Sequence, residues 1–411
     1  MGLLDKMLGR LMPAPDRALV TLGGVAIPAK LETYHFLAAG STGTGKTTLI
    51  DELLDTVIPR GDRCIVCDPS GHHLSHFWRE GDTVLNPFDR RSPGWSIFNC
   101  VRKDFDYDRL ARSVVPNAHG SDAQWHHYAQ QLLGAAARAL MLQGDGNTAA
   151  LMHWATTASK EDLGKLLAGT PAQGLFDADA ARALASTRFI LTSYLAAHKY
   201  MPPGDFSLRS WLESGSGNLF LTWREDMQTA LMPLVSCWVD VLANAVLSLP
   251  ADSARRIWFV LDELGGLGRL SSLEAALTRG RKHGLAVVTG LQSTSQLDRL
   301  YGREAAIVLR SCFRNLVVFG IAKSDPDTAE VLSRALGERE LEREQRSRSE
   351  GPQGITQGLS LKSSRERLVM PAQIAEMPDL TAYLALAGDR ATALVQLKPR
   401  ERPLVATAIE E

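Results

Sequence analysis

A glycine-rich turn near the N-terminus carries the clearest chemical signal in the sequence. The run from Gly40 to Thr47 reads Gly-Ser-Thr-Gly-Thr-Gly-Lys-Thr, which fits the pattern G-x-x-x-x-G-K-[ST] completely. It lies between a short apolar segment and a segment with helical periodicity, which is the context this motif requires. Gly40, Gly43 and Gly45 let the backbone curl so that its N–H groups face phosphate oxygens, and the next helix presents its positive end to the same charge. The turn is therefore predicted to bind the phosphates of a nucleotide.

The polar residues of this turn are predicted to hold ATP and Mg²⁺. Lys46 would reach the β- and γ-phosphates, and the Thr47 hydroxyl would ligate the magnesium ion. The other predicted cofactor-binding residues complete the loop and the first turn of the helix: Gly40, Ser41, Thr42, Gly43, Thr44, Gly45 and Thr48.

Two adjacent carboxylates, Asp262 and Glu263, follow the apolar run Ile257–Leu261. Five apolar residues fit a fully buried parallel strand, and ligands of open α/β sheets bind beyond the carboxyl ends of strands. Asp262 is predicted to hold magnesium through water, and Glu263 to orient and deprotonate the attacking water. A kinase would instead need a base that accepts a substrate hydroxyl, so the pair favours hydrolysis over phosphoryl transfer.

Gln292 and two arginines are further candidates that the residues alone leave open. Gln292 follows the apolar run Leu285–Thr289, where it could sense the γ-phosphate or merely hydrogen-bond the backbone at a strand end. Arg279 and Arg281 precede that run. A guanidinium offered to a neighbouring subunit's γ-phosphate would stabilise transition-state charge, but exposed arginines are more often only solvated.

Two other groups invite a metal or redox interpretation that the sequence does not support. Cys64 and Cys67 lie three residues apart on an expected strand, so their side chains point to opposite faces and free thiols are expected. His72, His73 and His76 have no cysteine or nearby carboxylate cluster to complete a metal site, so none is predicted there.

The elements that position these residues are apolar runs alternating with helical segments. Between about residues 104 and 212 helical spacing dominates instead. The predicted fold class is α/β, a RecA-like P-loop nucleotide-binding domain with a central, mainly parallel sheet, interrupted by an inserted all-α domain. The predicted divisions are 1–103, 104–212 for the insertion, and 213–411. Strands are expected at Tyr34–Ala39, Cys64–Cys67, Thr83–Leu85, Asn218–Thr222, Ile257–Leu261, Leu285–Thr289, Asn315–Phe319, Ala382–Leu386 and Ala393–Leu397.

Bulk properties set few limits on function. The net charge of −1 and the pI near 6.8 give no argument for DNA binding, although a local basic channel can hide in a neutral total. The apolar stretch Leu231–Leu249 contains Pro233, Asp240 and Asn244, which indicate a buried core helix rather than a membrane span. Arg343–Arg367 is polar and glycine-bearing, which predicts a mobile, solvated loop. The chain as given is expected to be cytoplasmic.

Several segments resemble the type IV coupling proteins of conjugation and type IV secretion, over about residues 27 to 397. The resemblance extends well beyond the phosphate-binding turn. The segments that carry it are Asn86-Pro-Phe-Asp-Arg-Arg-Ser-Pro-Gly-Trp-Ser-Ile-Phe-Asn, Phe206-Ser-Leu-Arg-Ser-Trp-Leu, Leu221-Thr-Trp-Arg-Glu-Asp-Met, Gly290-Leu-Gln-Ser-Thr-Ser-Gln-Leu-Asp and Val369-Met-Pro-Ala-Gln-Ile.

The resemblance implies a homohexameric ring that couples ATP hydrolysis to movement of single-stranded DNA. The DNA, with its bound relaxase, would move toward a type IV secretion channel. Nucleotide sites would lie between subunits, with Arg281 as the finger acting in trans and Gln292 as the sensor. The inserted helical domain would meet DNA or the relaxosome on the cytoplasmic side.

The sequence departs from the family at its start. Family members usually begin with two transmembrane helices, whereas the residues before Gly40 contain no segment able to span a bilayer. The chain is thus expected to be a cytosolic fragment or an anchorless natural form, and a monomer in solution would be consistent with either. A full protein with an anchor would lie at the cytoplasmic face of the inner membrane.

Two alternative functions stay open from the sequence. One is a translocase of the FtsK or HerA type that moves double-stranded DNA, and the other is a secretion ATPase or docking platform that handles only proteins. Strand preference in a binding assay would separate the first, and stimulation of the ATPase by single-stranded DNA would separate the second.

Overall fold

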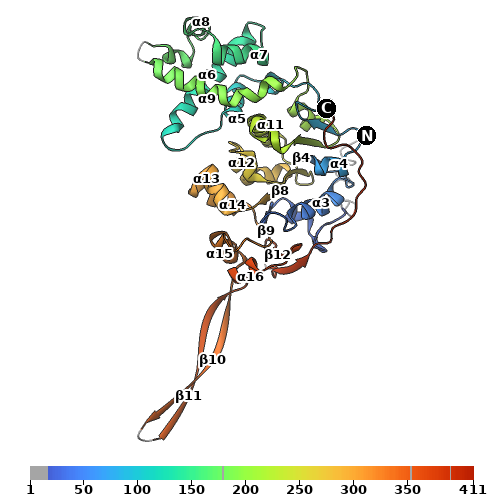
Figure 1. The fold of residues 1–411 in the computed structure, drawn as a ribbon, viewed down its shortest axis with the longest axis vertical. Coiled ribbons are helices and arrows are strands. Elements are labelled where there is room, and N and C mark those ends of the chain that lie inside the picture. The colour runs from blue at the N-terminus through green and yellow to red at the C-terminus, as the bar shows by residue number, and fades with distance from the viewer. Residues whose placement is uncertain (1–16, 178–179, 352–353, 389) are drawn as a thin grey trace, which may run out of the picture.

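A nine-stranded sheet forms the centre of the molecule, with a helical unit at one end and a two-stranded ribbon at the other (Figure 1). The computed structural model describes residues 17–177, 180–351, 354–388 and 390–411, and between 341 and 362 it describes the backbone alone. The sheet order is β13-β12-β9-β3-β8-β7-β4-β6-β5. The strands are β3 (Phe36–Ala39), β4 (Arg63–Pro69), β5 (Thr83–Leu85), β6 (Leu219–Trp223), β7 (Ile257–Leu261), β8 (Leu285–Leu291), β9 (Asn315–Val318), β12 (Thr381–Ala385) and β13 (Ala393–Gln396).

The sheet is mostly parallel, as the alternation of strands and helices predicts. All neighbours from β9 to β5 pair in parallel, whereas β12 runs antiparallel to both β9 and β13. Each of the nine apolar runs coincides with one strand of this sheet. The predicted α/β class with a central, mainly parallel sheet is therefore confirmed.

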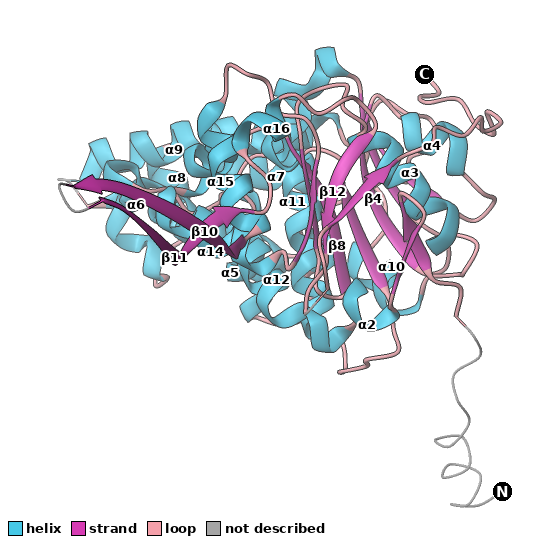
Figure 2. Cartoon of the chain, turned by 90° about the horizontal axis from the view of Figure 1, so that it is seen from below, coloured by secondary structure: helices cyan, strands magenta, loops and turns pink. Residues whose placement is uncertain are grey.

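Helices cover both faces of the sheet (Figure 2). Alternate residues along its strands enter different cores. On β4, Cys64 and Val66 join the core beneath α3 (Lys46–Val57) and α4 (His72–Phe77). Ile65 and Cys67 join the opposite core. The two cysteines are buried free thiols on opposite faces, as their spacing predicts.

The second face is covered by helices that follow β6, β7 and β8. These are α11 (Gln228–Ser248), α12 (Leu273–Arg279), α13 (Thr294–Tyr301) and α14 (Arg303–Cys312). By length and composition α11 could cross a membrane, but 67% of its apolar window is buried inside the protein. This agrees with the predicted core helix. The remaining elements of this domain are β1 (Val20–Leu22), β2 (Val25–Ile27), α2 (Ala29–Glu32), α15 (Pro326–Leu336) and α16 (Pro371–Ala375).

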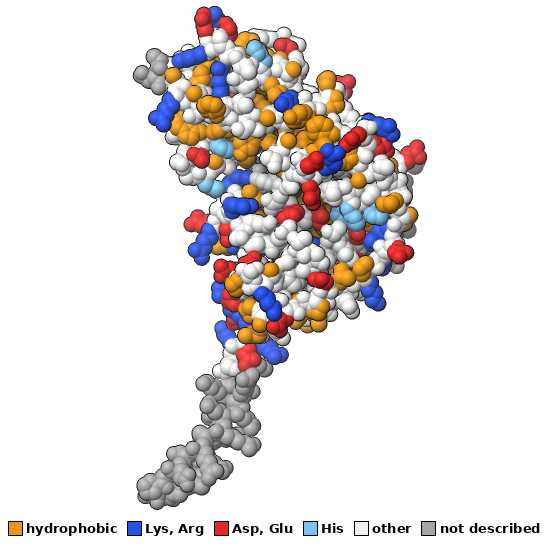
Figure 3. All heavy atoms as spheres, in the orientation of Figure 1, with side chains coloured by type: hydrophobic (Ala, Val, Ile, Leu, Met, Phe, Trp, Pro, Cys, Tyr) orange, Lys and Arg blue, Asp and Glu red, His pale blue; other side chains and the backbone are white. Residues whose placement is uncertain are grey.

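Between β5 and β6 the regular elements among the described residues are helices, joined by turns and loops. Apolar side chains gather on the face of this helical unit seen in Figure 3. The segments that lead into and out of the unit lie side by side: Trp95 forms a parallel bridge with Phe206, and its N–H donates to Pro202 O at 2.9 Å. The domain boundaries themselves stay a prediction. The helices are α5 (Phe105–Val114), α6 (Ala123–Leu142), α7 (Thr148–Met152), α8 (Lys160–Leu166), α9 (Ala181–Leu195) and α10 (Leu208–Ser214).

The predicted loop at Arg343–Arg367 is wrong. Its backbone forms most of an antiparallel ribbon of β10 (Glu338–Gly351) and β11 (Gly354–Arg367), which extends away from the sheet (Figure 1). Between Arg343 and Arg367 the sequence is polar and charged and shows no regular alternation of apolar and polar residues. The pattern that identifies strands in the sheet is therefore missing here.

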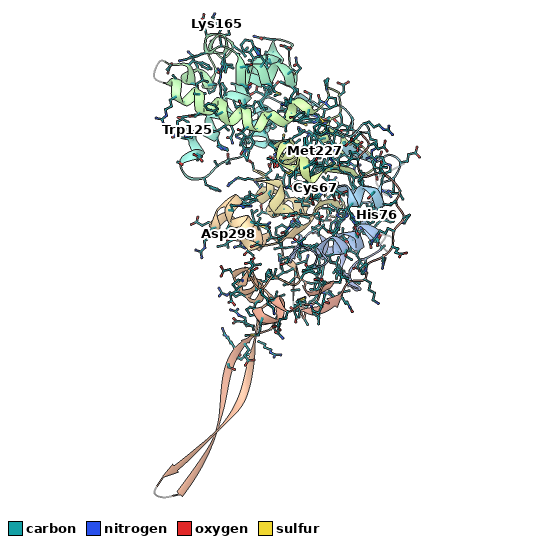
Figure 4. All side chains as sticks on the ribbon, in the orientation of Figure 1. Cys67, His76, Trp125, Lys165, Met227 and Asp298 are labelled. Carbon is teal, nitrogen blue, oxygen red and sulfur yellow. The ribbon has the colours of Figure 1, made fainter. Side chains whose placement is uncertain are left out.

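The last residues of the chain run without regular structure along α3 and α4 (Figure 1). Arg402 pairs with Asp55 of α3 at 2.7 Å, and Val405 N–H donates to Ser75 O at 2.8 Å. His76, on the outer side of α4 (Figure 4), contacts Pro403 O at 3.1 Å through Nδ1. This segment therefore covers the helix that follows the glycine-rich turn.

Candidate nucleotide site

The glycine-rich turn leaves the carboxyl end of β3 and is held by its neighbours. Gly40 N–H donates to Leu291 O, and Ser41 N–H donates to Gly320 O, both at 2.9 Å. Gly45 precedes α3 with a φ of 118°, a left-handed conformation that L side chains rarely adopt. α3 then begins at Lys46, so the free N–H groups of its first turn point toward the loop. The sequence thus forms the cradle that its motif predicts.

Lys46 is folded back onto the loop that would hold phosphate. Its Nζ donates to Gly40 O at 2.7 Å and to Ser41 O at 2.8 Å. Burial lowers the pKa of Lys46, while the carboxylates of Asp262 and Glu263 act to raise it. The ammonium therefore lies within electrostatic reach of both acids. The other loop residues are arranged around it: Thr44 is buried, Thr42 and Gly43 are exposed, and Ser41, Thr47 and Thr48 are partly exposed.

The acid pair follows the carboxyl end of β7 and the loop follows the carboxyl end of β3, with one strand between them. β8 lies between β3 and β7, with Leu291 opposite Ala39 and Thr289 opposite Leu261. The approach is close, because a Cβ on Gly290 would come within 2.0 Å of Asp262 O. The loop and the two carboxylates therefore lie at the same end of the strands, as the motifs require.

Glu263 is held by two glutamine side chains. Gln292 Nε2 donates to Glu263 Oε1 at 2.9 Å, and Gln296 Nε2 donates to the same oxygen at 3.2 Å. Gln296 was not among the predicted site residues; its sequence signal is the capping box Ser293-x-x-Gln296, which places it in the first turn of α13. The two donors orient Glu263 and leave Oε2 available.

Asp262 is approached from the side by a buried histidine, which the sequence reasoning missed. His73 Nε2 lies 4.0 Å from Asp262 Oδ2, and His73 Nδ1 bonds to Asp51 Oδ1 at 2.9 Å. His72 Nε2 bonds to Asp51 Oδ2 at 3.1 Å. The expectation that these histidines lack nearby carboxylates is therefore wrong, because Asp51 lies on a different helix and is brought to them only by the packing of α3 against α4.

Neighbouring carboxylates shift the pKa of His73. Burial alone would lower the pKa of His73, but the bond to Asp51 and the charges of Asp68 and Asp262 raise it to about 9. Burial would likewise raise the pKa of Asp51, yet hydrogen bonds from His72 and His73 hold it well below its usual range. The neighbouring carboxylates therefore outweigh burial in their effect on the pKa of His73.

Arg279 and Arg281 lie at the amino ends of the parallel strands, opposite to the end that carries the loop. They precede β8, whereas the phosphate loop follows the carboxyl end of β3. Arg281 is exposed and stacks on Tyr34, with 4.2 Å from its guanidinium carbon to the ring centroid. Together with Lys30, Arg256 and Lys282 the two arginines line an open basic depression. The structure does not bring them to the nucleotide site of their own chain.

The donor set at the loop suits a magnesium ion. The Thr47 hydroxyl and the Asp262 carboxylate are both partly exposed oxygen ligands, the type that Mg²⁺ prefers. Within the described chain no hydrogen bond engages the Asp262 carboxylate oxygens. Thr47, Asp262 and the phosphates of a nucleotide would together supply the usual ligands of such an ion.

Comparison with known sequences decides the family. Residues 19–398 match the family described as "Type IV secretion-system coupling protein DNA-binding domain". The chain belongs to the type IV coupling proteins. Among curated relatives, the coupling protein TraD of Escherichia coli K12 is 28% identical over 400 residues, which cover 94% of this chain and 56% of TraD. The conjugal transfer protein TraG of Rhizobium radiobacter is 30% identical over 174 residues, 42% of this chain and 27% of TraG.

Solved coupling proteins share the whole fold. The bacterial conjugative coupling protein TrwBdeltaN70 is 46% identical, with a TM-score of 0.91 over 99% of this chain and 94% of that one. A structure of plasmid coupling protein TrwB in complex with ADP and Mg²⁺ matches with a TM-score of 0.90 and the same identity over 99% of this chain and 95% of that one. This coupling-protein chain therefore spans nearly all of the solved TrwB chain. It spans only about half of the length of TraD and about a quarter of the length of TraG.

Proposed function

We propose that this coupling-protein chain is an Mg²⁺-dependent ATPase that drives DNA transfer. The observation that carries the proposal is the meeting of the glycine-rich loop and the Asp262–Glu263 pair at the carboxyl ends of the parallel strands, across β8. The complex of TrwB with ADP and Mg²⁺ supports the same ligands here, since the two chains are 46% identical. The residues Gly40 to Thr48 would hold the phosphates, and the ion would shield their charge.

Lys46 and Glu263 would perform the chemical step. Lys46 would leave the carbonyl oxygens of its own loop and contact the β- and γ-phosphates, where it stabilises charge on the transferred group. Glu263, oriented by Gln292 and Gln296, would take a proton from the attacking water with the oxygen that they leave free. Gln292 would report the loss of the γ-phosphate, because it bonds to the base directly.

Arg281 would act on the site of a neighbouring copy. In its own chain Arg281 is exposed at the amino ends of the strands, whereas the nucleotide site lies at their carboxyl ends. This excludes a contact of Arg281 with the nucleotide of its own chain. In a head-to-tail ring the amino ends of the strands of one copy would face the nucleotide site of the next copy. A guanidinium could then reach the γ-phosphate bound there. This supports an assembled homohexamer as the active form, with monomers inactive or nearly so.

The substrate would be single-stranded DNA with its relaxase, delivered to a type IV secretion channel. Family membership and the names of the relatives as conjugal transfer and coupling proteins support this role. The neutral total charge supplies no independent support. The chain would work at the cytoplasmic face of the inner membrane when joined to an anchor.

Stimulation by DNA tests the proposed substrate. Phosphate release by the assembled protein is measured with no DNA, with single-stranded DNA and with blunt duplex. We expect stimulation mainly by the single strand, and binding that weakens steeply with salt because phosphate contacts release counterions. Equal stimulation by duplex would favour a double-strand translocase, and no stimulation in an assembled sample would favour a platform for proteins. Glu263→Gln, which should bind ATP with little hydrolysis, is the reference for background.

A further inference from the structure

His73 is the one imidazole that connects the helix after the phosphate loop to the acidic end of β7, within the described residues. It follows β4 and the turn before α4, and its side chain is fully buried. Nδ1 is fixed by Asp51 of α3 at 2.9 Å, and Nε2 faces Asp262 Oδ2 at 4.0 Å. α3 and α4 lie on the same face of the sheet (Figure 1). The ring thus stands between two elements that would each contact the nucleotide.

The far side of this ring has no conventional partner. Among the described residues, His73 Nε2 makes no hydrogen bond, and neither does Oδ1 of the buried Asp68. Asp68 and Asp262 follow Cys67 and Leu261, which are paired neighbours on β4 and β7, so the two carboxylates emerge side by side. An unsatisfied buried polar group costs about 1–3 kcal/mol. A buried polar group without a partner therefore calls for an explanation, and a neighbouring functional site is one.

We propose that His73 is a positioning residue for Asp262. Anchored through Asp51, its ring directs Nε2 at Oδ2 of Asp262 and would fix the carboxylate in the orientation that holds magnesium. At 4.0 Å Nε2 and Oδ2 are beyond hydrogen-bond distance, so the ring acts on the carboxylate electrostatically. The proposal rests on the proposed function, because it takes Asp262 as the carboxylate that serves the nucleotide's metal ion. It adds an outer-shell partner of the kind that orients metal ligands elsewhere.

A metal site formed by the histidines themselves is the other possible interpretation. Asp51, His72 and His73 do place three ligand atoms close together. Both oxygens of Asp51, however, already accept hydrogen bonds from the two imidazoles, and Arg402 lies 3.2 Å from Asp51 Oδ2. A guanidinium in that position repels a cation. Asp51 therefore serves as an anchor for His73.

Two substitutions separate the two ends of the ring. His73→Asn places an amide nitrogen near the position of Nδ1, so it keeps the bond to Asp51 but loses the reach to Asp262. His73→Gln places its amide near Nε2 and does the reverse. His72→Asn is the matched control, because His72 also bonds to Asp51 but is 41% exposed in its side chain and has no contact with Asp262.

The measurement is the factor by which Mg²⁺ tightens binding of a fluorescent ADP analogue, with thermal unfolding recorded in parallel. We expect His73→Asn to reduce this factor about tenfold, as outer-shell changes do, while binding without Mg²⁺ is unchanged. His73→Gln should retain most of the factor, and His72→Asn all of it. If His73→Asn does not fold, Asp51→Asn is compared instead and should fall between wild type and complete loss.

Two results would overturn the proposal. One is a Mg²⁺ factor equal to that of the wild type in His73→Asn, and the other is an equal loss in His73→Asn and His73→Gln that follows their loss of thermal stability. Failure of the proposed function looks different, because the wild-type protein itself would then bind the ADP analogue without any response to Mg²⁺.

Discussion

The Lys46 ammonium lies against the backbone of the loop that would hold phosphate. It satisfies two carbonyl oxygens of this loop, at 2.7 and 2.8 Å, and its burial makes the charged form costly. A triphosphate offers stronger, charged acceptors for the same group. On binding of ATP, Lys46 would therefore exchange its hydrogen bonds to Gly40 O and Ser41 O for contacts with phosphate.

Replacing Lys46 by alanine should remove hydrolysis. Loss of one donor that stabilises developing charge lowers the rate by about 100-fold or more. Steady-state phosphate release at saturating ATP and Mg²⁺ measures the change. Lys165→Ala, on an exposed residue of α8 that pairs with Glu161, is the control and should leave the rate unchanged. Turnover of Lys46→Ala at the wild-type rate would overturn the assignment of the site.

His198 gives a prediction about stability at acid pH. It is buried against Trp95, no hydrogen bond reaches either ring nitrogen within the described chain, and burial lowers its pKa to about 4. The unfolded chain takes up this proton near pH 6.5, so stability present above that pH is lost as the pH falls toward about 4, by on the order of 3 kcal/mol.

Replacing His198 by phenylalanine should remove this loss and also raise stability at neutral pH. The substitution keeps a ring against Trp95 and deletes two unsatisfied nitrogens, worth roughly 1–3 kcal/mol. Thermal unfolding midpoints between about pH 4 and pH 7 measure the effect, with the exposed His127→Phe as control. A midpoint that falls with acid as steeply as in the wild type would refute the assignment to His198.

The sequence predicts the candidate site residues that belong to motifs, but not the neighbours that depend on packing. Lys46, Asp262, Glu263 and Gln292 follow strands, and parallel strands end at a common edge, so their meeting was predictable. The contact of His73 with Asp51 was not, because it depends on how α3 packs against α4. No periodicity in the sequence encodes that packing.

Strands of the sheet were predictable because both faces are buried. β7 occupies Ile257–Leu261, residue for residue as its apolar run indicates, and β8 extends two residues beyond its run. The ribbon of β10 and β11 was missed, since the sequence between Arg343 and Arg367 shows no regular alternation of apolar and polar residues. The hydrophobic pattern of a sequence therefore indicates which segments are buried. It indicates a strand only where that strand is buried.

The entry to the helical unit depends on a close crossing of two segments. Gly94 packs against Pro203 and Gly204, and a Cβ on Gly94 would come within 2.2 Å of Pro203 O. Gly94→Ala should therefore push the two segments apart and destabilise the protein by about 1–3 kcal/mol. Gly174→Ala is the control in the same unit, because a Cβ there meets no atom within 4 Å. Thermal unfolding midpoints that fall equally little in both variants would contradict this account.

At the scale of the whole molecule, the two ends of the parallel strands would carry complementary parts of the proposed site. The carboxyl ends have the loop and the acids, and the amino ends have the basic depression with Arg281. A single chain cannot bring them together. The proposed ring would do so by placing the amino ends of the strands of one copy against the nucleotide site of the next.

Mixing two inactive variants should restore activity. Lys46→Ala has an intact Arg281, and Arg281→Ala has an intact loop. In an equal mixture, roughly a quarter of the interfaces in a random ring combine the intact parts of both variants. Phosphate release should therefore rise above that of either variant alone. A double variant with both changes, mixed with wild type, controls for simple dilution. No recovery in a sample shown to be assembled would mean that Arg281 does not act in trans.

The most direct measurement of the central claim is ATP hydrolysis per chain as a function of protein concentration, at saturating Mg²⁺ and single-stranded DNA. The loop and the acid pair should hydrolyse ATP only when a neighbouring copy completes the site, so the rate per chain should rise with concentration and then level off. Glu263→Gln should stay at background across the same range. A wild-type rate that stays at the level of Glu263→Gln at every concentration would contradict the account.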